Sequence, residues 1–485
     1  MRAYVLRRLL IMIPTFFGIS LIIFVVLNIA PGKPGAAQRS AEVMLSAEDE
    51  TTQESHRLFR EQFNLDKPVL LNTLFGLTEA EVEHPLRLIA KLDESTHGDR
   101  VAAFDKLDEY GGYATPLLVH IMQRAHEQGQ TELRDAAVHF LASSAKRRLI
   151  DPHQPRPSPE LRRLNREIEA ENSYLDTLRY ARSAPEGAKL EVIEKWKLWF
   201  TEHAHRYQWG ALDKLRILFL ETRFAKYWQN LLRLDFGVSL TTREPVFSTL
   251  VSKLPYSLGL SVTSLLLAYL IAIPIGIFSA VRRDTLGDRT ATVVLFMLYS
   301  LPSFFVATVL IYALSEGSAY RWLRWFPTGG FSSPNIEDMT TWGAMRDVAW
   351  HLVLPVICMT YASLAAISRY MRSGLLEVIQ SDYVRTARAK GLPEVQVIGK
   401  HALRNGLLPI LTLLAGLLPA VLGGSVIIEY IFGIPGIGLW VIEAIYQRDY
   451  NVIMGVQLCS ALLVLVGILL TDLSYALVDP RIRYS

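Results

Sequence analysis

The side chains best suited to binding chemistry lie in one polar, basic segment, residues 381–409, between two hydrophobic stretches. Arginine and lysine alternate there with small and apolar residues, and Gly391 divides the segment into two potential helices. Pro393 occupies a first helical position and Glu394 the first turn, which favours a second helix over Val395–Arg404. The pattern predicts a helix–glycine–helix unit lying flat at a membrane surface. The alternative is an ordinary positively charged loop that only orients the chain in the membrane.

Sequence patterns that would indicate catalysis are absent. The phosphate-binding pattern G-x-x-x-x-G-K-[ST] does not occur, because the Gly-Lys pairs are followed by Pro34 and His401, so we do not expect this chain to hydrolyse ATP. His-Glu-x-x-His, Gly-x-Ser-x-Gly and Cys/His metal-ligand spacings are also missing. His203 and His205 are two residues apart in a predicted helix, so they would not share a face. We therefore predict no catalytic, cofactor or metal site in this chain.

A few acidic residues lie close to the hydrophobic stretches. Glu429 and Asp472 are near the ends of predicted spans, and Glu443 belongs to a predicted outer loop. Ionisable residues at such positions are candidates for function. Because each lies near an interface, we interpret them as structurally paired or as reaching the aqueous boundary, rather than as substrate contacts. The substrate-binding residues stay unknown.

The order of residues in the basic segment resembles a known family. YVRTARAKGL, followed by HALRN and LLP, is similar to the cytoplasmic loop of binding-protein-dependent ABC importer permeases of the dipeptide/oligopeptide/nickel branch. Two further stretches share the resemblance, EYIFGIPGIGLW and the tail Asp479-Pro480-Arg481, while Gly406 stands where the family more often has alanine. In that family an Ala-x-Ala-x-Gly core forms a coupling helix that docks in a groove of the ATPase. The resemblance implies an ATPase-coupling role for Tyr383, Arg385, Ala387, Arg388, Ala389, Lys390, Gly391, His401, Arg404 and Asn405.

The resemblance also implies a function and a set of partners. The chain would be a non-enzymatic permease subunit that moves di- or oligopeptides, or a similar small solute, across the inner membrane by alternating access. A second permease, two ATP-binding subunits that bind ATP and Mg, and a periplasmic binding protein would complete the importer, with membrane lipid around it and no nucleic acid. Two alternatives are an ion-coupled secondary transporter and a membrane-anchored interaction protein. Co-purification of an ATP-binding subunit would distinguish among them.

Composition indicates a membrane bundle joined to a sizeable polar region. Of the 485 residues 51% are hydrophobic and 20% are charged, and the mean hydropathy is +0.23. The net charge of +3 is too small to indicate a nucleic-acid partner. Only two cysteines occur, both in apolar stretches, so the polar region must be stabilised without disulfides.

Hydrophobic stretches predict six transmembrane helices in an all-α fold, as in a type I ABC importer permease. We expect the first helix within residues 1–30, a periplasmic region over 31–251, and a five-helix permease core over 252–485 with the coupling loop at 372–405. Arginine and lysine crowd the N-terminus, two inner loops and the tail, which predicts an inner-membrane protein with both termini in the cytoplasm. The predicted spans are residues 9–30, 258–281, 290–314, 351–371, 407–428 and 452–475.

The long polar region contains a predicted insert. Phe59–Leu71 and Tyr227–Val246 resemble external segments that are nearly adjacent in the family, so residues 72–224 form an extra helical domain. Gly98–Glu109 and Glu132–Ser143 share the spacing of arginine, paired alanines and leucine, which predicts a HEAT-like α-solenoid. A generic helical bundle is the alternative. The aromatics Trp196, Trp199, Phe200, Tyr207 and Trp209 are interpreted as core rather than as a ligand cage.

Overall fold

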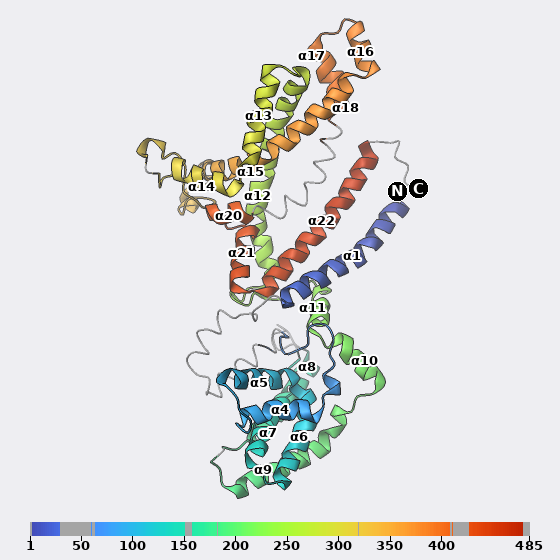
Figure 1. The fold of residues 1–485 in the computed structure, drawn as a ribbon, viewed down its shortest axis with the longest axis vertical. Helices are drawn as coiled ribbons and strands as arrows, with labels where there is room; N and C mark the ends of the chain where they lie inside the picture. The colour runs from blue at the N-terminus through green and yellow to red at the C-terminus, as the bar shows by residue number, and fades with distance from the viewer. Residues whose placement is uncertain are drawn as a thin grey trace. The chain divides into compact units, whose positions relative to one another are not determined.

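The computed structural model describes residues 2–29, 60, 64–150, 158–181, 183–318, 320–407, 410 and 426–478. The chain forms two compact units: unit 1 is Met1–Arg39 with Asp235–Ser485, and unit 2 is Ser40–Leu234 (Figure 1). Within the described residues the regular elements are all helices, and extended pairing is limited to two isolated bridges. The all-α prediction is therefore confirmed.

Unit 1 contains the apolar helices. Four of them are long and apolar enough to cross a membrane: α1 (Arg2–Ile29), α12 (Val246–Val281), α15 (Thr341–Ile379) and α22 (Tyr450–Val478). Two bent pairs satisfy the same test together, α13 (Leu286–Ser300) with α14 (Ser303–Leu314), and α20 (Val426–Phe432) with α21 (Ile437–Gln447). The described residues thus hold four candidate spans, or up to six if each bent pair is one span.

Two of the predicted spans are not single described helices. The predicted span over 290–314 is bent in the structure, because α13 and α14 meet at an angle of 92°. The reason is local: Leu301 is extended before Pro302, and Pro302 has no N–H to continue the helical ladder. Most of the predicted span 407–428 lies outside the described residues.

Helices α12 and α15 form the centre of unit 1. Small residues recur every fourth position along α12, and all four are buried: Ser264, Ala268, Ala272 and Gly276. A Cβ on Gly276 would lie 2.7 Å from the backbone oxygen of Ser368 in α15. Such a stripe lets two membrane helices approach closely and gain dispersion energy. This close packing sets the position of α15 against α12, and α15 continues toward the basic segment.

Unit 2 is helical and has its own core. Its helices are α4 (Glu79–Ile89), α5 (His97–Tyr110), α6 (Thr115–Glu127), α7 (Thr131–Ser144), α8 (Pro159–Thr177), α9 (Glu186–His203), α10 (Ala211–Leu220) and α11 (Arg223–Leu231). Helix α4 packs with α5 and α6 with α7, around a buried set that includes Leu107, Leu133 and Trp196. Trp196 and Trp199 are both buried there, as expected for core residues. The HEAT-like assignment stays a prediction.

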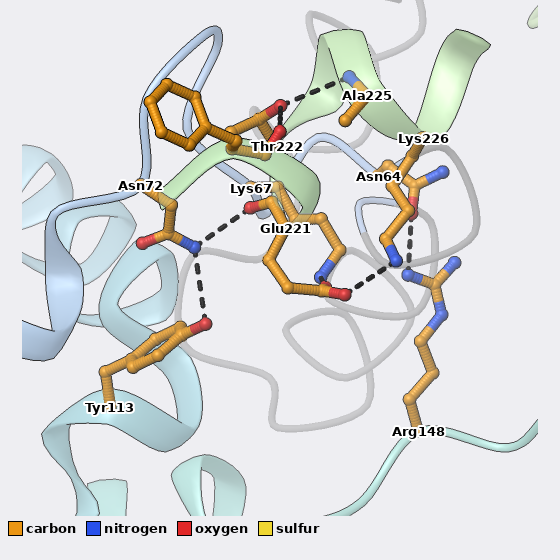
Figure 2. A network of polar contacts seen from close by, with 10 residues as sticks. Asn64, Lys67, Asn72, Tyr113, Arg148, Glu221, Thr222, Ala225 and Lys226 are labelled. Atoms are coloured by element: carbon orange, nitrogen blue, oxygen red, sulfur yellow. Dashed lines mark hydrogen bonds and ion pairs between the residues drawn. The ribbon is translucent and has the colours of Figure 1, made fainter. Parts of the chain in front are cut away.

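The two ends of the predicted insert lie side by side (Figure 2). Lys67 Nζ lies 2.7 Å from Glu221 Oε2, and the Asn72 amide donates to the Glu221 backbone oxygen at 2.9 Å. Lys226 Nζ binds the other carboxylate oxygen of Glu221 at 2.7 Å. The backbone N–H of Arg223 also donates to the oxygen of residue 68 at 2.9 Å. We call Lys67, Asn72, Glu221 and Lys226 the clasp; it joins the chain entering this region to the chain leaving it.

Candidate functional site

The basic segment folds as two short helical pieces around a glycine turn. Helix α16 (Asp382–Ala389) follows α15, and Gly391 adopts φ +75°, a left-handed conformation that ends the helix at no steric cost. The Gly391 N–H donates to the Arg388 oxygen at 2.9 Å. Pro393 caps α17 (Glu394–Gln396), which leads into α18 (Leu403–Gly406). The helix expected over Val395–Arg404 departs from the α form, since Val397–Ala402 is π-helical.

One face of this loop is packed against α15. Val384 and Ala387 of α16, with Val397 and Ala402, are buried in a cluster that includes Leu375 of α15. Among the residues predicted for coupling, Ala387 is therefore turned into the protein and is unavailable to a partner. Its small side chain instead lets α16 lie close to the bundle.

Gly406 has a packing reason as well. A Cβ at this position would lie 3.1 Å from Leu375 Cδ1 and 3.3 Å from Leu375 Cα. A Cβ here would need Leu375 to move by a few tenths of an ångström, so glycine suits the close approach of α18 to α15. The substitution noted in the sequence is thus a feature of close helix packing.

The other face is exposed and carries most of the predicted residues. The exposed ones are Tyr383, Arg385, Arg388, Ala389, Lys390, Gly391, Arg404 and Asn405, and His401 is half-buried. Asn405 Nδ2 donates to the Tyr383 hydroxyl at 2.7 Å, which connects the two ends of the loop. Val395 is 84% exposed and was not among the residues predicted for coupling. The exposed residues of the loop are thus cationic, with the small residues Ala389 and Gly391 and the apolar Val395 among them.

Charge also organises the turn. The hydrogen bonds from Arg388 hold the pKa of the Glu394 carboxyl below its ordinary value and raise the pKa of Arg388. Both groups are therefore charged at neutral pH, and the loop keeps its basic character through Arg385, Lys390 and Arg404. Among the residues that the structure describes, no cluster of His, Cys, Asp and Glu is suited to hold a metal ion.

A second ion pair ties α15 to its neighbour near the basic loop. Arg372 Nη2 lies 2.8 Å from Asp288 Oδ2, and Arg372 Nε lies 3.2 Å from Asp288 Oδ1. Asp288 also accepts from the Asp284 N–H at 3.0 Å, at the start of α13. The arrangement is bidentate and the carboxylate is buried, so it holds α13 and α15 in one fixed relation. Sequence reasoning did not find this pair.

Two glycines where α20 meets α21, Gly436 and Gly438, lie close to a buried carboxylate. Glu429 is fully buried, and its Oε2 accepts from the backbone N–H groups of Gly438 at 2.6 Å and Leu439 at 3.2 Å. A Cβ on Gly438 would lie 2.7 Å from the Cα of Val426. Glu429 therefore caps the first turn of α21 and fixes the 88° bend between α20 and α21. Of the two interpretations of Glu429, structural pairing is the one observed.

The other acidic residues differ. Glu443 is exposed on α21, whereas the side chain of Asp472 and the tail 479–481 lie outside what the structure describes. Asp449 was missed by the sequence reasoning. It is buried, accepts from the Ser239 hydroxyl at 2.5 Å and from the Val452 N–H at 3.3 Å, and so holds the turn at residues 237–239 against the start of α22.

Comparison with known proteins identifies the family of this chain. Residues 272–484 match the family described as binding-protein-dependent transport system inner membrane component. The oligopeptide transport system permease protein AppB of Bacillus subtilis is 41% identical over 263 residues, covering 54% of this chain and 80% of that protein. The chain belongs to this permease family.

Other members of the family are similar over comparable lengths. The di/tripeptide transport system permease protein DppB of Pseudomonas aeruginosa is 38% identical over 297 residues, 58% of this chain and 85% of that protein. The dipeptide transport system permease protein DppB of Escherichia coli is 36% identical over 262 residues, 52% of this chain and 77% of that protein. The protein is thus a membrane permease subunit of an ABC importer, and subunits of this kind are non-catalytic.

Proposed function

We propose that this permease imports peptides and that its basic loop is the docking site for a separate ATPase. The observation that carries the docking proposal is the outward face of the loop, where Ala389, Gly391 and Val395 are exposed between cationic side chains. Small residues allow a partner surface to approach closely, and an exposed valine gains free energy when a groove covers it. The names of the relatives, oligopeptide and dipeptide permeases, support a peptide substrate.

The proposed coupling is mechanical. Closure of the ATPases on ATP would displace the loop, and the loop would move with α15 because its inner face is packed into the bundle at Val384 and Val397. The Arg372–Asp288 pair would carry the movement into α13. Packed cores resist continuous deformation, so such a displacement favours a switch between outward- and inward-facing arrangements. A second permease would complete the translocation path, and a binding protein would deliver the solute.

Co-purification with the ATPase tests the docking proposal. Ala389→Glu places an unpaired carboxylate in the proposed interface, and we expect it to weaken ATPase retention by about tenfold or more. Ala188→Glu makes the same change at an exposed helical position in unit 2 and serves as the matched control. Equal retention by both variants would refute docking at this face. Competition by unlabelled dipeptides and oligopeptides for uptake tests the substrate class.

We further propose that both termini are cytoplasmic and that unit 2 lies in the periplasm. A cysteine at an exposed position of unit 2 would test this by chemical labelling. Ser158 is exposed, but replacing it would remove a helix cap, because its hydroxyl accepts from the Leu161 N–H of α8 at 3.1 Å. Ser183 is exposed in the turn before α9 and is the better position. A Ser183→Cys protein should react with a membrane-impermeant maleimide in intact spheroplasts. Labelling only after the membrane is opened would reverse the proposed topology.

A further inference from the structure

Helix α10 leaves most of its apolar surface uncovered. Seven of its ten residues are apolar, ALDKLRILFL, yet Ile217 is the one large apolar side chain that is buried. Leu212 is 82% exposed, Leu215 is 54% exposed and Phe219 is 55% exposed. Their spacing of three and four residues places them on one face of the helix. A continuous exposed stripe of this kind marks a surface that is covered in the working molecule.

The surroundings of this stripe are also apolar. Leu220 at the end of α10 is exposed, and so is Leu71. The Asn72 N–H donates to the Leu218 oxygen at 3.0 Å, so the segment that carries Leu71 runs beside the last turn of α10. The opposite side of the helix is anchored within unit 2, where Ile217 is buried and Lys214 Nζ lies 6.0 Å from the ring centre of Phe75. One side of α10 is thus packed within unit 2, and the other side is exposed.

Charge favours an anionic occupant. Residues 211–234 contain five basic and two acidic side chains. Three of the bases are engaged within unit 2, because Lys226 binds Glu221, Arg223 donates to backbone oxygens and Lys214 lies over the Phe75 ring, whereas Arg216 and Arg233 are exposed. Both acids are already engaged, because Asp213 accepts from the Gly210 N–H at 3.1 Å and Glu221 belongs to the clasp. Arg216, four residues after Leu212, is exposed beside the apolar stripe. An arginine there can lay its stem along an apolar boundary and place its guanidinium among anionic headgroups.

The chain that joins unit 2 to the nearest predicted span is short. Unit 2 ends at Leu234 and the membrane-spanning helix α12 begins at Val246. The eleven residues between them span at most ~40 Å when fully extended. A domain of this size is itself about 40 Å across, so the tether keeps the bilayer within reach at high effective concentration.

We infer that α10 binds the membrane surface, with Leu212, Leu215 and Phe219 at the boundary between headgroups and acyl chains. An amphipathic helix with an apolar stripe and basic flanks binds a bilayer in this orientation. The occupant is a lipid surface; a second copy of the chain or another protein is an alternative that the experiment distinguishes. The inference concerns the extra region of this chain and is independent of its substrate and of ATPase docking.

Spin-label accessibility in the full-length chain tests the inference. Cys358 and Cys459 are first replaced by alanine, and single cysteines are introduced by Leu212→Cys, Leu215→Cys and Phe219→Cys. Glu202→Cys, on the exposed end of α9, is the matched control. The protein is reconstituted in vesicles of phosphatidylethanolamine and phosphatidylglycerol, and collisions with oxygen and with a water-soluble nickel chelate are compared.

The expected result is a ratio of oxygen to nickel collisions at least about threefold higher at all three α10 positions than at the control, as immersion in acyl chains requires. A ratio equal to the control would mean that the face is in water, which overturns the inference. Immobilised labels that neither reagent reaches would mean that protein covers the face, which also overturns it.

Discussion

Arg388 and Glu394 form a two-point ion pair across the turn at Gly391. Nη2 of the arginine lies 2.7 Å from Oε1 of the glutamate, and Nε lies 3.2 Å from Oε2. Both side chains are about half-exposed, so the pair contributes only about 0.2–1 kcal/mol. Its importance is geometric, because two parallel hydrogen bonds fix the direction in which α17 leaves α16.

Reversing this pair tests that role. Arg388→Glu should lower peptide uptake several-fold, because two adjacent carboxylates repel and open the angle between the helices. The double variant Arg388→Glu with Glu394→Arg should recover much of the uptake, measured in membrane vesicles with the partner subunits. A double variant as inactive as Arg388→Glu would indicate instead that Arg388 acts directly on the ATPase.

Gly391→Val tests the left-handed turn. A β-branched residue at φ +75° is strained by about 1–2 kcal/mol, so the turn should open while the chain stays in the membrane. We expect normal expression, loss of substrate-stimulated ATP hydrolysis and loss of uptake. Gly399→Val is the control, since Gly399 is exposed, has no positive φ and has open space around a Cβ. Wild-type coupling in Gly391→Val would contradict the proposed role.

Removing the Glu429 carboxylate should destabilise unit 1. Glu429→Leu leaves the buried N–H of Gly438 and the partly buried N–H of Leu439 without this acceptor, at about 1–3 kcal/mol for the buried group and less for the other. Glu429→Gln keeps an acceptor oxygen and should lose less. Thermal unfolding of the detergent-solubilised chain measures both, with Glu443→Leu at an exposed position of α21 as the control. A Glu443→Leu protein as unstable as Glu429→Leu would remove the capping explanation.

Unit 2 should fold when it is expressed alone, and a fragment that includes the clasp should be the more stable one. Thr73–Arg223 contains the core but omits Lys67, Asn72 and Lys226, whereas Asn64–Leu234 retains them. We expect both fragments to be monomeric, helical and cooperative in thermal unfolding, with the longer one melting at the higher temperature. Circular dichroism makes the comparison; an unfolded longer fragment would refute the autonomous domain.

The clasp should also make unit 2 sensitive to acid. Burial would raise the pKa of Glu221, but hydrogen bonds from Lys226 and Lys67 outweigh burial and hold its pKa below the ordinary 4.5. Because the folded-state pKa is the lower one, the contribution to stability is complete above pH 4.5 and is lost as pH falls through the folded value.

Glu221→Gln provides the measurement. In the Asn64–Leu234 fragment this variant should lower the free energy of unfolding by about 1–3 kcal/mol at pH 7. The difference from the wild type should shrink as the pH is lowered below 4.5, because the wild-type carboxyl then becomes neutral too. Glu202→Gln, at an exposed position, controls for loss of charge alone. A difference that does not change with pH would show that the charge of Glu221 is not what holds the clasp.

Sequence reasoning succeeded where the structure depends on the backbone preferences of single residues. Gly391 and Pro393 determine the turn through their own backbone preferences, so the helix–glycine–helix pattern could be predicted. The inward orientation of Ala387 could not, because it depends on how α16 packs against α15. The Arg372–Asp288 pair joins residues 84 apart, and no periodicity within one segment reveals such a contact. The capping role of Glu429 likewise required the bend between α20 and α21 to be known.

The clasp has a consequence for the order of events during synthesis. Lys67 and Glu221 are 154 residues apart, so at ~5–20 residues per second the ribosome makes the first roughly 8–30 s before the second. Closing a loop of that length in an unstructured chain would cost about 4 kcal/mol in entropy. Folding of the intervening helices during this interval brings the two ends together beforehand. In that order of events the ion pair would join ends that are already adjacent, and α12 would follow a domain that folds ahead of it.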